Sequence, residues 1–274
     1  RFGFKRVPVV VSERFCDLPQ RLSRIERFSR WFYRFANWVV VNSHHQRENF
    51  LVKYPWLSKR ISTIYNGYDL IELAPISSEP DNQPLRLLTI ASISPYKNVL
   101  CLVEALRILK ETHSLTPTVS WVGRRFKYGE YALYVREMEE KIKAYGLEKQ
   151  WFWLGQRTDV IDQYYTHDVL VHPSYGEGLP NVVCEAMCCA RPVIVSDTLD
   201  HPRLVENGKS GLLFDYRNPA DLAEKIRQFS ALPTQVRIEM GRIGRKFAEA
   251  HLAEKRFLDE YQKLMVQLLR GAKE

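Results

Sequence analysis

The sequence lacks any apolar run long enough to cross a membrane. No stretch approaches the roughly 18 consecutive apolar residues that a bilayer-spanning helix requires. The apolar run VPVVV at 7–11 is too short for the apolar region of a signal peptide, and no small-residue cleavage site follows it. We therefore expect neither a spanning helix nor a cleaved leader here. With 45% hydrophobic and 26% charged residues, the composition also excludes a disordered or fibrous protein.

Cysteine is scarce and odd in number. Of five cysteines, three crowd together in CEAMCC as Cys184, Cys188 and Cys189. A zinc site needs CxxC or Cys/His pairs with further ligands, and the sequence offers neither, so we expect no bound metal. Small residues that pack a helix are the favoured interpretation. Because N-glycosylation sequons are missing as well, we expect a reducing cytoplasm.

Acidic residues are scarce at the beginning of the chain. Residues 1–60 carry 13 Lys and Arg against 4 Asp and Glu, whereas the rest of the chain carries 27 against 28. In residues 21–38, RLSRIERFSRWFYRFANW, arginines alternate with aromatic residues, which suits a lipid headgroup interface. A solvated helix whose aromatics pack on their own domain is an equally weighted alternative. Nucleic acid is not expected, because the excess does not extend over a domain.

After the linker-like segment GYDLIELAPISSEPDNQP at 67–84, strand and helix signals alternate regularly. The apolar strand candidates are residues 85–92, 118–123, 151–155, 169–174, 192–196 and 211–215. Continuous apolar strands that alternate with helices indicate a parallel sheet covered on both faces. We therefore expect an α/β fold with a Rossmann-like domain over 85–250. A partial Rossmann-like domain at 1–66 precedes it, and a C-terminal helix at 251–274 packs back towards that part.

The segment GEGLPNVVCEA at 176–186 directly follows a predicted strand, where such sheets bind ligands. Pro180 suits the first position of a helix. The N–H groups around Gly178 to Asn181 would then point out of the helix start and, with the helix dipole, form a site for phosphate. Gly178 lets the backbone come close to a ligand.

Two carboxylates flank this segment. Glu185 projects among apolar residues and cysteines of the predicted helix, so it needs a partner, because burying an unpaired carboxylate is costly. That partner is an arginine, a backbone donor or a pair of ligand hydroxyls, and a structural ion pair is the alternative to a functional role. Glu177 lies in the loop before the helix, where we expect it to face the cleft.

The E-x7-E block in EGLPNVVCEAM, together with ARPVIVSD, ENGKSGLLF, IYNGYD and SPYKN, resembles the family 4 retaining glycosyltransferases of GT-B fold. The likeness covers essentially the whole chain. It implies that Glu185 holds the ribose hydroxyls of a nucleotide and that Glu177 lies beside the donor sugar. It also implies that the N–H groups of Gly178 and Leu179 cradle sugar and diphosphate, and that Lys97 neutralises the leaving diphosphate. A solvated loop lysine is the alternative for Lys97.

Three positions depart from the family pattern. Ala91-Ser92-Ile93 stands where the family has an arginine-bearing triplet, so one half of the diphosphate clamp is absent. Arg125, or its neighbour Arg124, follows the strand that ends in WVG and is our candidate substitute; Arg125 also replaces the second glycine of a G-x-G pattern. Arg203 stands in place of an acid in PRLV.

The first 66 residues match only the last two strands and helices of a GT-B N-terminal domain, so we expect that the first part of that domain is missing. The sequence begins with Arg1 rather than Met. His44 and His45 do not match a catalytic position, and we expect them at the surface or in packing.

The sequence thus predicts a retaining transferase that moves a sugar from a UDP-sugar, without a metal, to a glycan or lipid-linked acceptor of cell-surface polysaccharide synthesis. The basic, aromatic segment 21–38 would hold it at the inner face of the cytoplasmic membrane. Whether the reaction follows front-face attack or a covalent intermediate stays open. One rival is a donor-binding fragment that needs a separate acceptor domain. A dehydrogenase, the other rival, would require GxGxxG, which does not occur.

Overall fold

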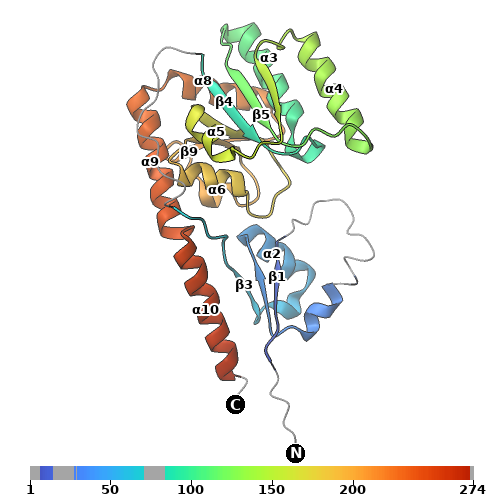
Figure 1. Cartoon of the computed structure of the whole chain (residues 1–274), viewed down its shortest axis with the longest axis vertical. Helices are drawn as coiled ribbons and strands as arrows, with labels where there is room; N and C mark the ends of the chain where they lie inside the picture. The colour runs from blue at the N-terminus through green and yellow to red at the C-terminus, as the bar shows by residue number, and fades with distance from the viewer. Residues whose placement is uncertain (1–6, 15–27, 29, 71–83, 272–274) are drawn as a thin grey trace, which may run out of the picture. The chain divides into compact units, whose positions relative to one another are not determined.

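The computed structural model describes residues 7–14, 28, 30–70 and 84–271. The chain divides into two compact units (Figure 1). The smaller unit comprises residues 1–69, 176–179 and 251–274, and the larger one comprises residues 70–175 and 180–250. Within the described ranges, no helix is both long and apolar enough to cross a bilayer.

The smaller unit is built on a parallel three-stranded sheet. Its strands, in the order β1-β2-β3, are β1 (Val10–Glu13), β2 (Trp38–Val41) and β3 (Ile61–Thr63). Its described helices are η1 (Phe32–Phe35), α2 (His44–Lys53), η2 (Pro55–Leu57) and α10 (Glu254–Gly271). Strand β3 and helix α2 are additions to the elements that the sequence predicted.

Alternation along β2 gives this sheet two buried faces. Val39 and Val41 pack with Phe50 of α2 on one face, while Val40 packs with Leu264 of α10 on the other. Successive side chains of a strand point to opposite faces, so one apolar strand can serve two cores.

Helix α2 begins where the side chain of Ser43 accepts a hydrogen bond from the Gln46 N–H at 3.0 Å, which satisfies one of the free donors of its first turn. His44, which is exposed, opens this helix and packs its ring against Tyr65 at 5.5 Å between centroids. His45 is half-buried. Both histidines thus lie at the surface or in packing, as expected.

The larger unit contains a six-stranded parallel sheet of order β6-β5-β4-β7-β8-β9. The strands are β4 (Arg86–Ile90), β5 (Thr118–Val122), β6 (Trp151–Gly155), β7 (Val169–His172), β8 (Val193–Ser196) and β9 (Gly211–Phe214). Each lies inside a segment that the sequence predicted as a strand. The strand order reverses between β4 and β7, which pair directly through Leu87 and Val169. In a doubly wound sheet, ligands bind at such a switch point.

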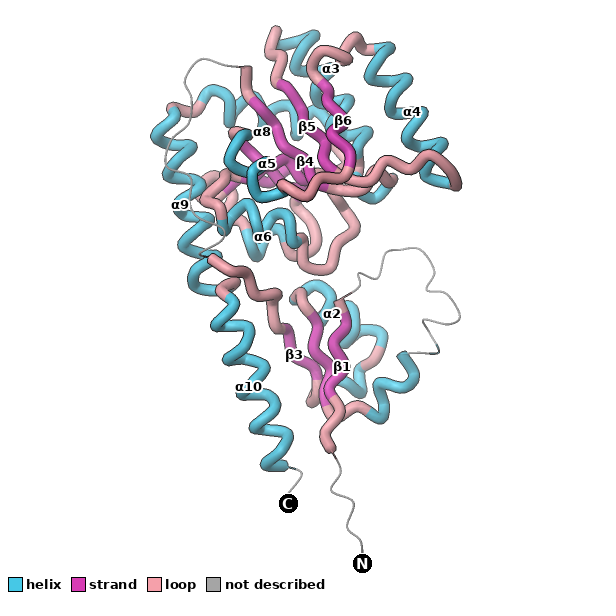
Figure 2. Tube along the Cα trace, in the orientation of Figure 1, coloured by secondary structure: helices cyan, strands magenta, loops and turns pink. Residues whose placement is uncertain are grey.

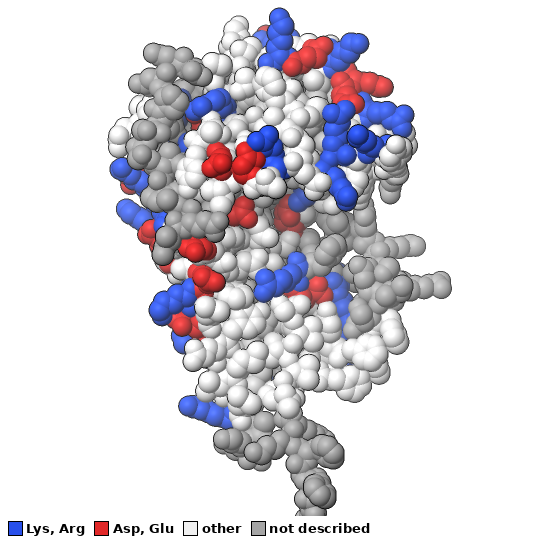
Figure 3. Space-filling model, viewed as in Figure 1, with Lys and Arg blue, Asp and Glu red and all other residues white. Residues whose placement is uncertain are grey.

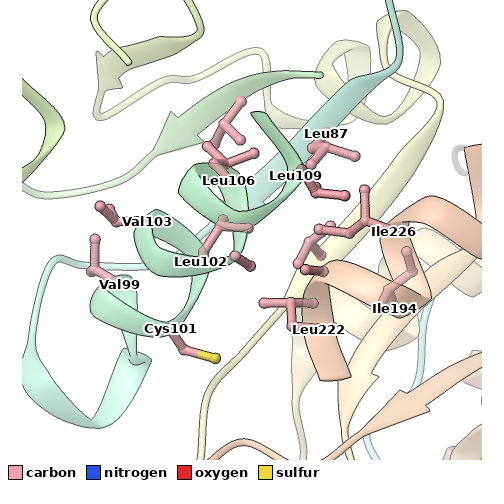
Figure 4. Close-up of a cluster of buried hydrophobic side chains, with 14 of the residues drawn as sticks. Leu87, Val99, Cys101, Leu102, Val103, Leu106, Leu109, Ile194, Leu222 and Ile226 are labelled. Carbon is pink, nitrogen blue, oxygen red and sulfur yellow. The ribbon is translucent and has the colours of Figure 1, made fainter. Parts of the chain in front are cut away.

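Helices cover both faces of this sheet (Figure 2). They are α3 (Val99–His113), α4 (Glu130–Ala144), α5 (Val160–Thr166), α6 (Asn181–Cys188), α7 (His201–Leu204), α8 (Pro219–Ala231) and α9 (Thr234–His251). On one face, Leu102 and Leu106 of α3 meet Leu222 and Ile226 of α8 above β4 (Figure 4). Each such fully buried side chain contributes about 1.5–3 kcal/mol of transfer free energy, so this layer fixes the sheet that carries the site.

Several predicted segments are described only in part; the C-terminal helix predicted at 251–274, for example, is described up to residue 271. Of the predicted helix at 21–38, residue 28 and residues 30–38 are described; they include helical residues and η1. Of the predicted linker at 67–84, residues 71–83 lie outside the described residues. Tyr68 is described, and its N–H donates to the Leu252 carbonyl oxygen at 2.9 Å.

Candidate functional site

The turn after β4 and the loop after β7 are joined at the switch point. The carbonyl oxygen of Tyr96 accepts hydrogen bonds from the Ser174 hydroxyl at 3.2 Å and from the Tyr175 N–H at 3.0 Å. The two carboxyl ends of neighbouring strands are thereby held together. This junction positions Lys97 on one side and the approach to α6 on the other.

Lys97 ends the short helix η3 (Pro95–Lys97) and is half-buried. Its Nζ lies 5.7 Å from the centroid of the Tyr96 ring, a favourable position for a cation over an aromatic face. The next residue, Asn98, has a left-handed φ of 56° and donates from Nδ2 to the Tyr216 carbonyl oxygen at 2.8 Å. This bond anchors the turn, so a positive charge is held at the carboxyl edge of the sheet.

Helix α6 begins one residue later than its sequence suggested. Pro180 is the residue that precedes the helix, and its carbonyl oxygen accepts from the N–H groups of Val183 and Cys184 at 3.0 and 3.1 Å. Pro180 was expected as the first helical residue; its ψ of 87° is not helical. Because proline has no side-chain acceptor, the side chain of Pro180 does not cap the start of α6.

The loop before α6 belongs to the smaller unit by its contacts. Gly178 and Leu179 are buried there, and Glu177 is half-buried. A Cβ on Gly178 would meet Asn42 Oδ1 at 3.1 Å and the Arg14 carbonyl oxygen at 3.2 Å. Glycine at this position therefore permits close packing of the protein chain. Asn181 is exposed as the first residue of α6.

Glu185 is half-buried on α6 and has a neutral partner. The Tyr164 hydroxyl donates to its Oε2 at 2.7 Å and also lies 3.2 Å from the Val182 carbonyl oxygen. Burial raises the pKa of Glu185, and the hydrogen bond from Tyr164 opposes that rise. Among the described residues the partner is thus a hydroxyl of α5 rather than an arginine, which does not support the structural ion pair.

The two neighbouring arginines after β5 have different partners. Arg125 forms an ion pair with Glu139 of α4 at 2.5 Å. The Arg124 guanidinium lies 5.6 Å from the Phe126 ring centroid, and its carbonyl oxygen accepts from the Ile93 N–H at 2.9 Å. Ile93 leads directly into the turn that carries Lys97, so Arg124 is fastened beside that turn.

Arg203 also has a structural partner. Its Nη1 lies 3.1 Å from Oδ1 of Asp200, which is fully buried. The arginine that replaces an acid in PRLV therefore compensates a buried carboxylate.

Several residues at this edge of the sheet were not predicted from the sequence. Tyr164 lies 21 positions before its partner Glu185, with no local pattern that links the two. His172 and His201 are buried with their rings 5.5 Å apart, and Nδ1 of His201 lies 3.0 Å from the Ser196 hydroxyl. A histidine at the end of a buried apolar strand, in VLVHPS, was the available signal.

In the part of the chain that the structure describes, no group of three or more His, Cys, Asp or Glu side chains is arranged to hold a metal ion.

Comparison with known proteins gives consistent matches. The family described as Glycosyl transferases group 1 matches residues 72–247, and Glycosyltransferase Family 4 matches residues 1–72. The D-inositol 3-phosphate glycosyltransferase of Corynebacterium jeikeium is 26% identical over 234 residues, which cover 80% of this chain and 54% of that protein. The N,N'-diacetylbacillosaminyl-diphospho-undecaprenol alpha-1,3-N-acetylgalactosaminyltransferase of Campylobacter jejuni is 38% identical over 74 residues, 27% of this chain and 20% of that protein. The chain therefore spans about half the length of the first of these relatives and a fifth of the second.

The crystal structure of Anabaena Alr3699/HepE in complex with UDP and glucose has the same fold, with a TM-score of 0.82 at 24% identity. The match covers 94% of this chain and 71% of that one. The group 1 match alone extends over most of the chain, from the linker to α9, and the family 4 match covers the segment before it. The chain belongs to the family 4, group 1 glycosyltransferases, with the Rossmann-like sheets of the GT-B fold.

Proposed function

We propose that this chain is a retaining glycosyltransferase that transfers a sugar from a UDP-sugar to a glycan or lipid-linked acceptor. The observation that carries the proposal is Glu185, a half-buried carboxylate with a hydroxyl partner, on the helix that starts at the switch point. Such a carboxylate is suited to accept hydrogen bonds from a vicinal pair of hydroxyls, as ribose presents them. The crystal structure of Alr3699/HepE contains UDP, which supports the choice of nucleotide.

The diphosphate of the donor would bind between Lys97 and the start of α6. Lys97 supplies a full positive charge, and the N–H groups of the residues around Gly178 to Asn181 supply the positive end of a helix dipole. Charge builds up on the diphosphate as the sugar departs, so both groups stabilise the transition state more than the ground state. We propose that they fill the role that a metal ion has in other transferases.

Glu177 would act at the donor sugar. A carboxylate beside the anomeric carbon favours the positive charge that develops there as the glycosidic bond breaks. We propose that the acceptor oxygen becomes bonded to the anomeric carbon on the same face of the sugar that the diphosphate leaves. The product then has the anomeric configuration of the donor. A proton NMR spectrum of the product, with its anomeric coupling constant, would test that outcome directly.

The acceptor is proposed from relatives and from the charge of the N-terminal segment. The name of the Campylobacter relative contains diphospho-undecaprenol, a lipid carrier. Residues 1–60 carry the excess of Lys and Arg, which favours a location at the inner, anionic face of the cytoplasmic membrane. We place the reaction in cell-surface polysaccharide synthesis on these grounds.

The alternative proposal is a donor-binding fragment or subunit that requires a separate acceptor-binding domain. The smaller unit has three strands in its described sheet, half as many as the larger unit. This alternative predicts that the chain binds the nucleotide sugar and releases no product with any acceptor, until a second polypeptide is added.

The test is calorimetric titration of the whole chain with a panel of nucleotide sugars. We expect UDP-sugars to bind, and we expect Glu185→Ala to weaken binding at least about tenfold, because a hydrogen bond to a charged group contributes about 1.5–3 kcal/mol. Glu206→Ala is the matched control, since Glu206 is an exposed acid of the same unit, paired with Lys209. Binding that Glu185→Ala leaves unchanged, or no binding at all, would refute the proposal.

A further inference from the structure

The described residues 28 and 30–35 combine a buried arginine with a group of exposed aromatic side chains. Arg30 is only 4% exposed. Four aromatic side chains are exposed by contrast: Phe28 by 64%, Trp31 by 47%, Phe32 by 48% and Phe35 by 68%. We call these four side chains the aromatic face. An amphipathic helix at a protein surface normally has the reverse arrangement.

The inner side of the segment is fixed by a carboxylate of the sheet. Glu13 of β1 accepts a hydrogen bond from the Tyr33 hydroxyl at 2.6 Å and pairs with Arg30 Nε at 3.4 Å. The Arg30 guanidinium also lies 5.0 Å from the Phe50 ring centroid, and the Tyr33 ring stacks on the same ring at 6.3 Å. Turning the segment over would leave Glu13 without these partners, so its exposed side is determined by the fold.

The aromatic face is a continuous cluster. Phe28 and Phe32 are in edge contact at 5.3 Å between centroids, and Trp31 contacts Phe32 and Phe35 at 5.4 Å each. In the part of the smaller unit that the structure describes, these rings do not belong to the two buried clusters on either face of the β1-β2-β3 sheet. Contiguous exposed apolar residues of this kind mark a surface that binds something apolar. The alternative that the aromatics of this segment pack on their own domain therefore holds for Tyr33 and fails for these four.

The cations beside the aromatic face indicate what it binds. Arg34, which is exposed, and Arg60 both lie over the Trp56 ring, at 5.8 and 5.0 Å from its centroid. Arg60 also donates to the carbonyl oxygens of Arg34 and Ala36 at 3.2 and 3.0 Å. Exposed Trp and Phe bordered by arginine match the headgroup region of an anionic bilayer, where rings enter the acyl boundary and cations meet lipid phosphates.

We propose that the aromatic face inserts into the headgroup region of an anionic lipid bilayer, with Arg34 and Arg60 at its border. In the view of Figure 3, charged side chains lie over the upper end of the smaller unit, and the visible surface below them is largely uncharged. This membrane contact would bring the chain to the lipid-linked acceptor of the proposed reaction. Only this biological purpose rests on the proposed function. The contact itself does not involve the donor site.

The test is flotation of the whole chain of residues 1–274 with vesicles. We expect it to float with vesicles of equal parts phosphatidylglycerol and phosphatidylcholine, and much less with phosphatidylcholine alone. The variant Trp31→Ser/Phe32→Ser/Phe35→Ser should lose at least about tenfold in partitioning, because three rings no longer enter the lipid. Phe152→Ser is the matched control, since Phe152 is an aromatic residue of β6 that is 45% exposed, and it should float like the unchanged chain.

Arg34→Ala separates the charge contribution from the apolar one. It should weaken binding to the anionic vesicles, to a degree that falls as salt is added, and leave binding to neutral vesicles unchanged. Three results would overturn the inference: no flotation of the unchanged chain, equal flotation of the triple variant, or conversion of a dimer to a monomer by the triple variant without lipid binding. UDP affinity, measured on the same samples, reports on the proposed function separately.

Discussion

At the residue scale, the surroundings of Glu185 disfavour the ionised form of its carboxyl group when no ligand is bound. Burial raises its pKa above the ordinary value of 4.5, so the folded chain binds this proton more tightly than the unfolded chain does. Stability from this group is therefore greatest at low pH and declines as the pH rises from the unfolded pKa through the raised folded one. The ionised form of Glu185 thus opposes folding until a ligand binds it.

We predict that Glu185→Gln does not lower the melting temperature of the empty protein at about pH 7, and raises it if any change occurs, while it weakens UDP binding. The amide keeps an oxygen that can accept from the Tyr164 hydroxyl. Any gain should disappear at about pH 3, well below the ordinary pKa of a glutamate, where the carboxyl is largely protonated in both states. Thermal unfolding at the two pH values and a UDP titration are the measurements. A clear loss of stability at neutral pH would contradict the assignment of burial as the cause of the shift.

Tyr164→Phe should change the pH dependence of the same site. The Tyr164 hydroxyl lowers the pKa of Glu185, so its removal should move the pH at which UDP affinity develops to higher values, with affinity restored as the carboxyl ionises. Binding isotherms over a pH series would measure the midpoint. Tyr145→Phe is the control, because the Tyr145 hydroxyl donates to Glu104 instead. An unshifted midpoint would mean that ionisation of Glu185 does not govern binding.

The two arginines after β5, Arg124 and Arg125, are alternative candidates for a second cation that binds the diphosphate. Arg125 is paired with Glu139, whereas Arg124 is fastened beside the Lys97 turn, so we now favour Arg124 as the second cation. Arg124→Ala should weaken UDP binding about tenfold, the equivalent of one charge-assisted hydrogen bond, and leave the affinity for uridine unchanged. Arg125→Ala should have little effect on either ligand. The reverse order of effects in a titration would assign the role to Arg125.

At the element scale, α9 approaches the end of α6 closely at one glycine. A Cβ on Gly241 would lie 1.9 Å from the Ala190 carbonyl oxygen, whereas the nearest atom to a Cβ on Gly244 is 3.6 Å away. Gly241→Ala should therefore destabilise the protein by about 1–3 kcal/mol or more. Gly244→Ala, on the same helix, should be neutral or stabilising by up to about 1 kcal/mol. Urea unfolding measures both, and similar losses in the two variants would show that the approach of α9 is not what matters.

The elements that the sequence predicted well are the strands buried on both faces. Their apolar runs are continuous, as in LRLLTI and VLVH, and turns separate them clearly. Strand β3 was missed because IST has three residues and two of them are polar. The orientation of the segment that carries the aromatic face could not be predicted. The spacing of its arginines does not reveal that Arg30 is buried in an ion pair with Glu13 of β1.

The positions of the candidate site could be proposed from the sequence, whereas their partners could not. The segment with Glu185 was selected because it follows a strand of the predicted parallel sheet, where ligands bind, and Lys97 was selected because SPYKN resembles a motif of the family. Tyr164 and the Ser174–Tyr96 contact arise only when β7 folds between β4 and β8, which no local pattern encodes. The start of α6 was misplaced by one residue because proline is compatible both with the first helical position and with the residue before it.

At the scale of the whole molecule, the larger unit has a core of its own. Its main cluster of buried side chains runs from Leu85 to Met240, and all of its members belong to that unit. An ion pair between Arg86 and Asp168 at 2.6 Å joins β4 to β7 within it. A domain of this size buries enough surface to fold alone.

We predict that residues 84–250, expressed alone, fold cooperatively and bind UDP within about tenfold of the whole chain. Lys97, Tyr164 and Glu185 all belong to this segment, whereas the contacts of the 176–179 loop with the smaller unit would be lost, which accounts for a modest loss of affinity. Amide NMR dispersion and calorimetry measure folding and binding, with Glu185→Ala in the same segment as control. If the segment folds and UDP binds only to the whole chain, the nucleotide site requires the smaller unit, and the larger unit does not hold the donor by itself.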